Sequence, residues 1–218
     1  MIKLTAGIDE AGRGALAGPV VASCVILPPH FLTEILDDSK RLSPKRRREI
    51  AAILKGSACY GVGKASEKVI DQENILRATF CAMKAACDIM QDRLPQWLTF
   101  AYPEYNGEGI DLDVVVDGNR IPFAVDNVAT DEQDEAGAAA VQKESIEAVV
   151  KADATIPSVQ AASIIAKVAR DEIMVYYDKL YPGWGYAQHK GYPTQEHKEA
   201  IARLGPSPIQ RMTFKWKS

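Results

Sequence analysis

The chain has 218 residues, of which 47% are hydrophobic, and a formal net charge of −3, so it is long enough to bury one substantial core. No segment approaches the roughly 20 consecutive apolar residues that a membrane-spanning helix needs, and the acidic Asp9 and Glu10 argue against a secretory signal peptide. The four cysteines form no CxxC pair, and we expect all of them to be reduced and buried. We therefore expect a cytoplasmic protein without a membrane partner.

The predicted elements alternate between strands and helices. β-Branched or small apolar runs predict strands at 3–9, 19–27 and 59–66. Ser43 as N-cap and Pro44 at the first helical position predict a helix through residue 54, and a second helix is expected over 74–94. Short apolar runs that end in acids predict strands at 112–119 and 146–154. Two helices, at 159–181 and 194–204, complete the pattern, and Gly205-Pro206 stops the last one.

Acidic residues end three of the predicted strands. They are Asp9 with Glu10, then Asp117, and finally Asp153. Side chains alternate along a strand, so Asp9 and Glu10 share a site only if the strand gives way to a loop there. If the first, fourth and fifth strands are neighbours, four carboxylates come together, and such a set needs cations to offset its repulsion. Oxygen ligands without histidine favour Mg²⁺ or Mn²⁺, and two such ions suit phosphodiester hydrolysis.

The glycine-rich loop after the first strand, "GRGALAGP", fits neither common nucleotide-binding motif. Gly12, Gly14 and Gly18 have one residue too many for a dinucleotide fingerprint, and Pro19 stands where a P-loop needs lysine. What remains is exposed backbone that a ligand can approach closely, with Arg13 placed to meet a phosphate.

Charge is distributed unevenly along the chain. Between Glu104 and Glu147 there are 12 acidic and two basic residues, so this segment carries −10 and the remainder of the chain +7. Basic residues gather at 39–49 and 179–217, which is typical either of a nucleic-acid-binding surface or of a solvated face. Residues of about 121–147 resemble an acidic surface insertion, which we expect to project away from a nucleic-acid substrate.

Several blocks occur in the order found in ribonuclease HII, the type 2 RNase H family, which this chain resembles over nearly its whole length. They are "GIDEAGRGALAGPVVASCVILP", "DDSKRLSPKRR", "ENILRATFCAMKAA", "VVVDGN", "VVKADATIPSVQAASIIAKVARD" and "HKGYPTQEHKEAIARLGPSPIQR". The resemblance implies an α/β, RNase H-like fold with a central five-stranded mixed sheet flanked by helices and a helical C-terminal extension. It also implies an endoribonuclease that cuts the RNA strand of RNA/DNA hybrids and single ribonucleotides in duplex DNA, leaving 3′-hydroxyl and 5′-phosphate ends.

The resemblance assigns roles to particular residues. The metal-binding catalytic acids of the family fall on Asp9, Glu10, Asp117 and Asp153. Its GRG motif falls on Gly12, Arg13 and Gly14, whose backbone contacts the 2′-hydroxyl and the adjoining phosphate, and its sugar-packing tyrosine falls on Tyr192. Lys40, Asn74 and Ser163 are further expected substrate contacts.

Two alternatives remain open on the residues alone. One is another two-metal nuclease on a related fold, and the other is a non-catalytic nucleic-acid-binding protein. We expect a catalytic core over 1–157, containing the insertion, and a helical part over 158–218 that closes over the substrate, together one compact unit. We also expect a monomer, and the tail "QRMTFKWKS" has no evident sliding-clamp peptide.

Overall fold

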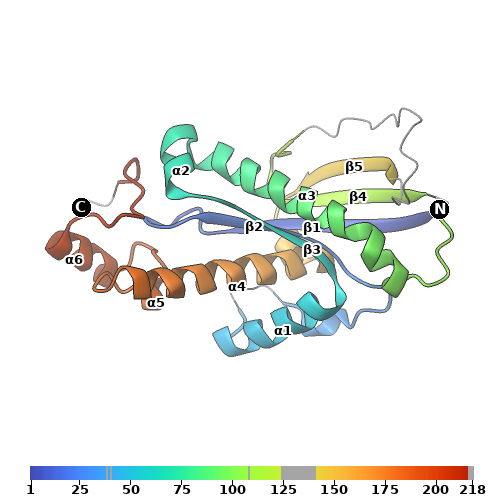
Figure 1. Ribbon diagram of the computed structural model, residues 1–218, viewed down its shortest axis with the longest axis horizontal. Coiled ribbons are helices and arrows are strands. Elements are labelled where there is room, and N and C mark those ends of the chain that lie inside the picture. Colours follow the sequence, from blue (N-terminus) through green and yellow to red (C-terminus); the bar gives the residue numbers. More distant parts are fainter. Residues whose placement is uncertain (38, 40, 108, 124–140, 216–218) are drawn as a thin grey trace.

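The computed structural model describes residues 1–37, 39, 41–107, 109–123 and 141–215. Their strands form one five-stranded mixed sheet in the order β3-β2-β1-β4-β5 (Figure 1). β1 pairs antiparallel with β2 and parallel with β4, and β5 lies parallel to β4. The carboxyl ends of β1, β4 and β5 therefore lie at one edge of the sheet, which confirms the predicted neighbours. The strands are β1 (Ile2–Ala11), β2 (Val20–Ile26), β3 (Cys59–Ala65), β4 (Ile110–Asp117) and β5 (Val141–Val149).

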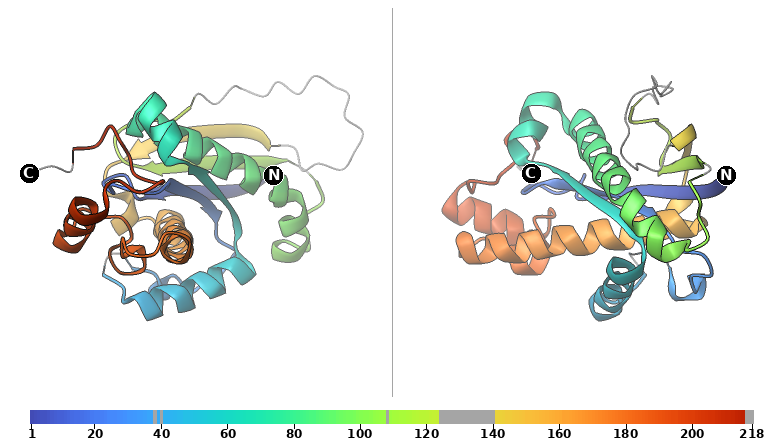
Figure 2. Two further views of the ribbon diagram at one scale, coloured as in Figure 1. Left: turned by 60° about the vertical axis from the view of Figure 1, so that its left-hand side comes forward. Right: turned by 45° about the vertical axis from the view of Figure 1, so that its right-hand side comes forward.

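Helices cover both faces of the sheet (Figure 2). The long helix α3 packs on β2 and β3, whereas α4 packs on the other face against β1 and β2, with α1 beside it. α5 and α6 lie beyond the sheet, at the far end of α4 (Figure 1). The helices are α1 (Pro44–Ser57), α2 (Glu67–Glu73), α3 (Ile75–Ala101), α4 (Pro157–Leu180), α5 (Tyr186–His189) and α6 (Gln195–Leu204).

The predicted helix starts are confirmed by their capping contacts. The Ser43 hydroxyl accepts a hydrogen bond from the Arg46 amide, with Pro44 at the first helical position. The Thr194 hydroxyl likewise accepts from the amide of His197 at the start of α6. Each cap satisfies an amide that the first turn of a helix leaves without a partner.

Glycine allows the closest contact between the sheet and α4. A Cβ atom on Gly7 of β1 would lie 2.2 Å from both the Ser158 carbonyl carbon and the Val159 nitrogen of α4. Only a residue without a side chain lets the two backbones approach this far. This contact brings the first half of α4 against the strand that carries Asp9.

Four expectations from the sequence need correction. β1 does not end at Asp9, because Glu10 and Ala11 still pair with β2. Residues 141–147, expected in the acidic insertion, belong to β5, and the rest of that insertion, 124–140, lies outside the described residues. Asp153 stands in a short 3-10 helix (Ala152–Ala154) rather than at the end of a strand. Cys24, Cys59 and Cys87 are buried as expected, but Cys81 is exposed.

Within the described ranges, none of the helices combines the length and apolar character that crossing a lipid bilayer requires.

Candidate functional site

Three of the four predicted acids meet at the carboxyl edge of the sheet. One carboxylate oxygen from each of Asp9, Asp117 and Asp153 lies within 4.8 Å of the others. Asp9 comes from β1 and Asp117 from the last position of β4, while the main-chain amide of Asp153 lies 3.5 Å from the Asp117 carboxylate. An all-oxygen set of this kind fits Mg²⁺ or Mn²⁺, which prefer carboxylate and water ligands.

Glu10 is not part of this group of three. Glu10 follows Asp9 directly in β1, and its charge adds to the effect of burial in raising the pKa of Asp9. The Glu10 carboxylate lies 3.1 Å from the Arg13 guanidinium. The predicted role of Glu10 as a metal ligand stays a prediction.

Asp9 is the most deeply buried carboxylate of the group, with 5% of its surface exposed. Burial, and secondarily the charge of Glu10, raises its pKa to about 8, while hydrogen bonds from Ser163 and from the Glu10 amide act in the opposite direction. The charge of Asp117 adds to the increase. Burial and the neighbouring charges disfavour the ionised form of Asp9. This environment fits a site in which a bound cation stabilises the carboxylate.

Ser163 of α4 holds Asp9 in place through a buried chain of hydroxyls. Its Oγ hydrogen-bonds the Asp9 carboxylate and lies 2.8 Å from the Oγ of Ser39. Since each hydroxyl has one proton, Ser163 donates to the carboxylate only if Ser39 donates to Ser163. Ser163, expected to contact the substrate, is 4% exposed here and faces Asp9.

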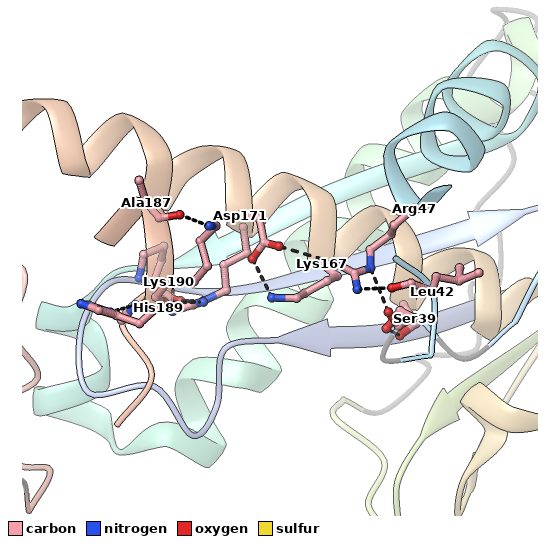
Figure 3. A network of polar contacts seen from close by, with 12 residues as sticks. Ser39, Leu42, Arg47, Lys167, Asp171, Ala187, His189 and Lys190 are labelled. Atoms are coloured by element: carbon pink, nitrogen blue, oxygen red, sulfur yellow. Dashed lines mark hydrogen bonds and ion pairs between the residues drawn. The ribbon is translucent and has the colours of Figure 1, made fainter. Parts of the chain in front are cut away.

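A polar network continues from Ser39 along α1 and α4 (Figure 3). The guanidinium of Arg47 donates to the carbonyls of Ser39 and Leu42, 2.8 Å from each, and lies 3.7 Å from the Asp171 carboxylate. Asp171 in turn accepts from Lys167 at 2.6 Å. Arg47 thus binds the main chain on both sides of position 40 in the sequence. Lys40 itself, a predicted substrate contact, lies outside the described residues.

The GRG segment follows directly from β1, next to the acids. Gly12 is buried at φ +97°, and a Cβ atom on it would lie 1.9 Å from the Arg170 Nε, so no other residue fits there. Arg13 and Gly14 are exposed, and a Cβ on Gly14 would meet nothing within 4 Å. The backbone of this segment is therefore accessible at Arg13 and Gly14 but not at Gly12.

Tyr192 lies in the turn between α5 and α6, close to the same loop. Its half-buried ring has the Arg170 guanidinium 5.1 Å and the Lys167 ammonium 5.4 Å from its centroid. Two cations at this distance hold the ring by cation–π contacts. The main chain beside it is tied to the glycine loop, because the Leu16 amide donates to the Gly191 carbonyl.

Asn74 also has a structural role, as the N-cap of α3. Its side-chain oxygen accepts from the amides of Leu76 and Arg77 and so caps α3. Asn74 is exposed and takes a left-handed φ of 73°. Its predicted contact with the substrate remains a prediction.

Comparison with known proteins identifies the family. The family model described as Ribonuclease HII matches residues 6–217. The ribonuclease HII of Geobacter sulfurreducens is 44% identical over 214 residues, covering 96% of this chain and 81% of that protein. The ribonuclease HII of Treponema denticola is 44% identical over 210 residues, covering 95% and 96%. The chain belongs to the ribonuclease HII family.

A solved structure of similar fold supports this family assignment. The RNase HII of Archaeoglobus fulgidus, solved in a complex with PCNA, aligns with a TM-score of 0.60 at 26% identity, covering 99% of this chain and 96% of that one. As a member of this family, the chain is an endoribonuclease that cleaves the RNA strand of RNA/DNA hybrids, and enzymes of the family depend on divalent metal ions.

Three buried arginines could not be recognised from the charge pattern. That pattern places Arg47 and Arg211 in the two basic segments and Arg170 in a helix, yet they are 7%, 0% and 0% exposed. Each donates to main-chain carbonyls of the loops around the site. The amphipathic pattern could have placed Arg170 on the buried face of α4, but nothing local marks Arg211.

Proposed function

We propose that this endoribonuclease cleaves both RNA/DNA hybrids and single ribonucleotides in duplex DNA by two-metal-ion hydrolysis, leaving 3′-hydroxyl and 5′-phosphate ends. The observation that carries the proposal is the position of the Gly12-Arg13-Gly14 segment, exposed at Arg13 and Gly14, which follows the same strand that presents Asp9 to Asp117 and Asp153. Recognition of a 2′-hydroxyl and cleavage of the neighbouring phosphodiester can then be aligned by one rigid element. Such an enzyme serves ribonucleotide removal and RNA primer processing in the cytoplasm.

The acids of the chain would hold the metal ions in this scheme. Asp9, Asp117 and Asp153 supply converging oxygens, and Glu10, whose charge acts on Asp9, is the proposed fourth ligand. When bound, divalent ions activate the attacking water and stabilise the leaving oxygen. Ser163 keeps Asp9 oriented through its hydrogen bond, so that the carboxylate is placed before the substrate arrives.

Substrate recognition falls to the groups around the acids. The exposed backbone of Gly14 can donate to an oxygen of the ribonucleotide, and the side chain of Arg13 can meet the adjoining phosphate. Tyr192 supplies an apolar ring for the sugar of the next nucleotide, already fixed by the Lys167 and Arg170 cations. Lys40 and Asn74 are proposed backbone contacts. The substrate is the one partner we propose for this monomer, since the tail offers no evident clamp peptide.

The deciding experiment is Mg²⁺-dependent cleavage of a labelled duplex with one ribonucleotide, beside the identical all-DNA duplex. A single cut on the 5′ side of the ribonucleotide, with the all-DNA duplex intact, is the expected result. Cleavage of both duplexes would favour a two-metal nuclease without ribonucleotide specificity. Binding without cleavage, in Mg²⁺ and in Mn²⁺, would favour the non-catalytic alternative.

A further inference from the structure

The glycine loop between β1 and β2 rests on two buried guanidinium groups. Arg170 of α4 donates to the carbonyls of Pro19, Ala17 and Lys190 at 2.9, 3.2 and 3.0 Å. Arg211, from the segment after α6, lies close enough to Arg170 that the two charges interact unfavourably. Two positively charged guanidinium groups therefore lie against the inner side of the loop, which binds them through its main-chain carbonyls.

Arg211 makes the contacts nearest the GRG motif. Its Nε donates to the Gly18 carbonyl at 2.9 Å and its Nη1 to the Arg13 carbonyl at 3.0 Å. Its main-chain amide adds a bond to the Leu16 carbonyl at 2.9 Å. One side chain thus joins both ends of the segment 13–18, although Arg211 lies 198 positions after Arg13 in the sequence.

Holding this guanidinium in place is costly. Arg211 is fully buried, and its Nη2 finds no hydrogen-bond acceptor among the described residues. Burial, and then the neighbouring charge of Arg170, lowers the pKa of Arg211 to about 9. An apolar side chain of the same volume would avoid these penalties but would leave the Gly18 and Arg13 carbonyls without this donor, so the arginine serves the main chain that it binds.

The geometry of the peptide bond links Arg211 to the substrate side. In a trans peptide the carbonyl oxygen and the following amide hydrogen point in opposite directions. Because the Arg13 carbonyl points inward to Arg211, the Gly14 N–H points away from the protein interior. Gly14 is exposed, and the space above its Cα is open to 4 Å. A reversed peptide would present a carbonyl oxygen there, which repels a phosphate oxygen.

We propose that Arg211 is a positioning residue for ribonucleotide recognition: it fixes the orientation of the Arg13–Gly14 peptide so that the Gly14 N–H faces the substrate. This inference rests on the proposed function, in which the GRG backbone contacts the ribonucleotide. Arg211 touches no reacting atom in this role. It acts only through the loop whose carbonyls it binds.

The test compares Arg211→Met and Arg211→Lys with the unchanged chain on a duplex containing one ribonucleotide. Methionine fills the site without a donor, and lysine can reach one carbonyl but cannot bridge two. We expect kcat/KM to fall at least tenfold for Arg211→Met and less for Arg211→Lys. Affinity for the ribonucleotide duplex relative to the all-DNA duplex, measured in EDTA, should fall in the same order. Melting temperatures identify any variant that has lost its fold.

Gln210→Leu is the matched control, because the Gln210 amide donates to the Leu16 carbonyl of the same loop but not to the Arg13–Gly14 peptide. It should keep kcat/KM within about threefold of the unchanged chain. Equal losses in Gln210→Leu and Arg211→Met, or a folded Arg211→Met with unchanged kcat/KM, would overturn the proposal. If the unchanged chain does not distinguish the ribonucleotide duplex from the all-DNA duplex, the proposed function is wrong, and this inference, which rests on it, is wrong as well.

Discussion

The environment of Asp9 sets a pH dependence for the metal-free protein. Its pKa rises from 3.8 to about 8 on folding, chiefly because the carboxyl is buried. The folded state therefore binds a proton that the unfolded state releases. The contribution of the Asp9 carboxyl to stability is fully present below pH 4 and is lost as the pH rises toward 8. We expect Asp9→Asn to abolish Mg²⁺-dependent cleavage. In EDTA at pH 8 we expect it to be more stable than the unchanged chain, by over about 1 kcal/mol.

Urea unfolding in EDTA at pH 5 and pH 8 measures this effect, with the larger gain for Asp9→Asn expected at pH 8. Asp88→Asn is the control, since Asp88 is half exposed and pairs with Lys84 on the surface of α3. Added Mg²⁺ should stabilise the unchanged chain and leave Asp9→Asn nearly unaffected. A pH-independent difference between the two proteins would contradict the assigned pKa.

At the scale of elements, the contact between β1 and α4 carries the site. A methyl group on Gly7 would lie 2.2 Å from main-chain atoms of α4, so helix and strand must separate. Separation also moves Ser163 away from Asp9. We expect Gly7→Ala to destabilise the protein by about 2 kcal/mol or more and to lower kcat in the fraction that stays folded. Thermal unfolding and cleavage rates measured on one preparation test both effects.

Gly56→Ala provides the comparison for Gly7→Ala. Gly56 lies in α1, and its added methyl group would meet nothing within 4 Å, so we expect a gain of about 0.5–1 kcal/mol from helix propensity and unchanged cleavage. A Gly7→Ala protein as stable and active as Gly56→Ala would show that the close contact is dispensable.

The elements also show which parts of the site the sequence could reveal. The meeting of Asp9 and Asp117 was predictable, because acids near the carboxyl ends of two parallel neighbouring strands lie at the same edge of the sheet. The continuation of β1 through Glu10 and Ala11, which both pair with β2, was not specified by any local pattern. Arg211 was beyond reach for another reason: its partners lie nearly the whole chain away, and only the folded arrangement brings them together.

At the scale of the whole molecule, the proposed parts 1–157 and 158–218 share one core. Ala161, Ile164 and Ile165 of α4 belong to a buried cluster with Val25 of β2 and residues of α1. The segment after α6 returns to the first part as well, because Asp71 of α2 accepts the amides of Met212 and Thr213. Neither part could bury its apolar surface alone, so we propose a single cooperative unit.

Two tryptophans allow that unity to be measured. The Trp97 ring donates to the Ser57 carbonyl in the first part, and the Trp184 ring donates to the Gly205 carbonyl in the second. With Trp216→Phe as the common background, Trp97→Phe leaves a reporter of the second part and Trp184→Phe a reporter of the first. In each variant, we expect the fluorescence transition in urea to have the same midpoint and slope as the transition that circular dichroism records for that variant. If Trp184 lost its native fluorescence at lower urea than the signal from Trp97, the C-terminal part would be a separate unit that docks on a stable core.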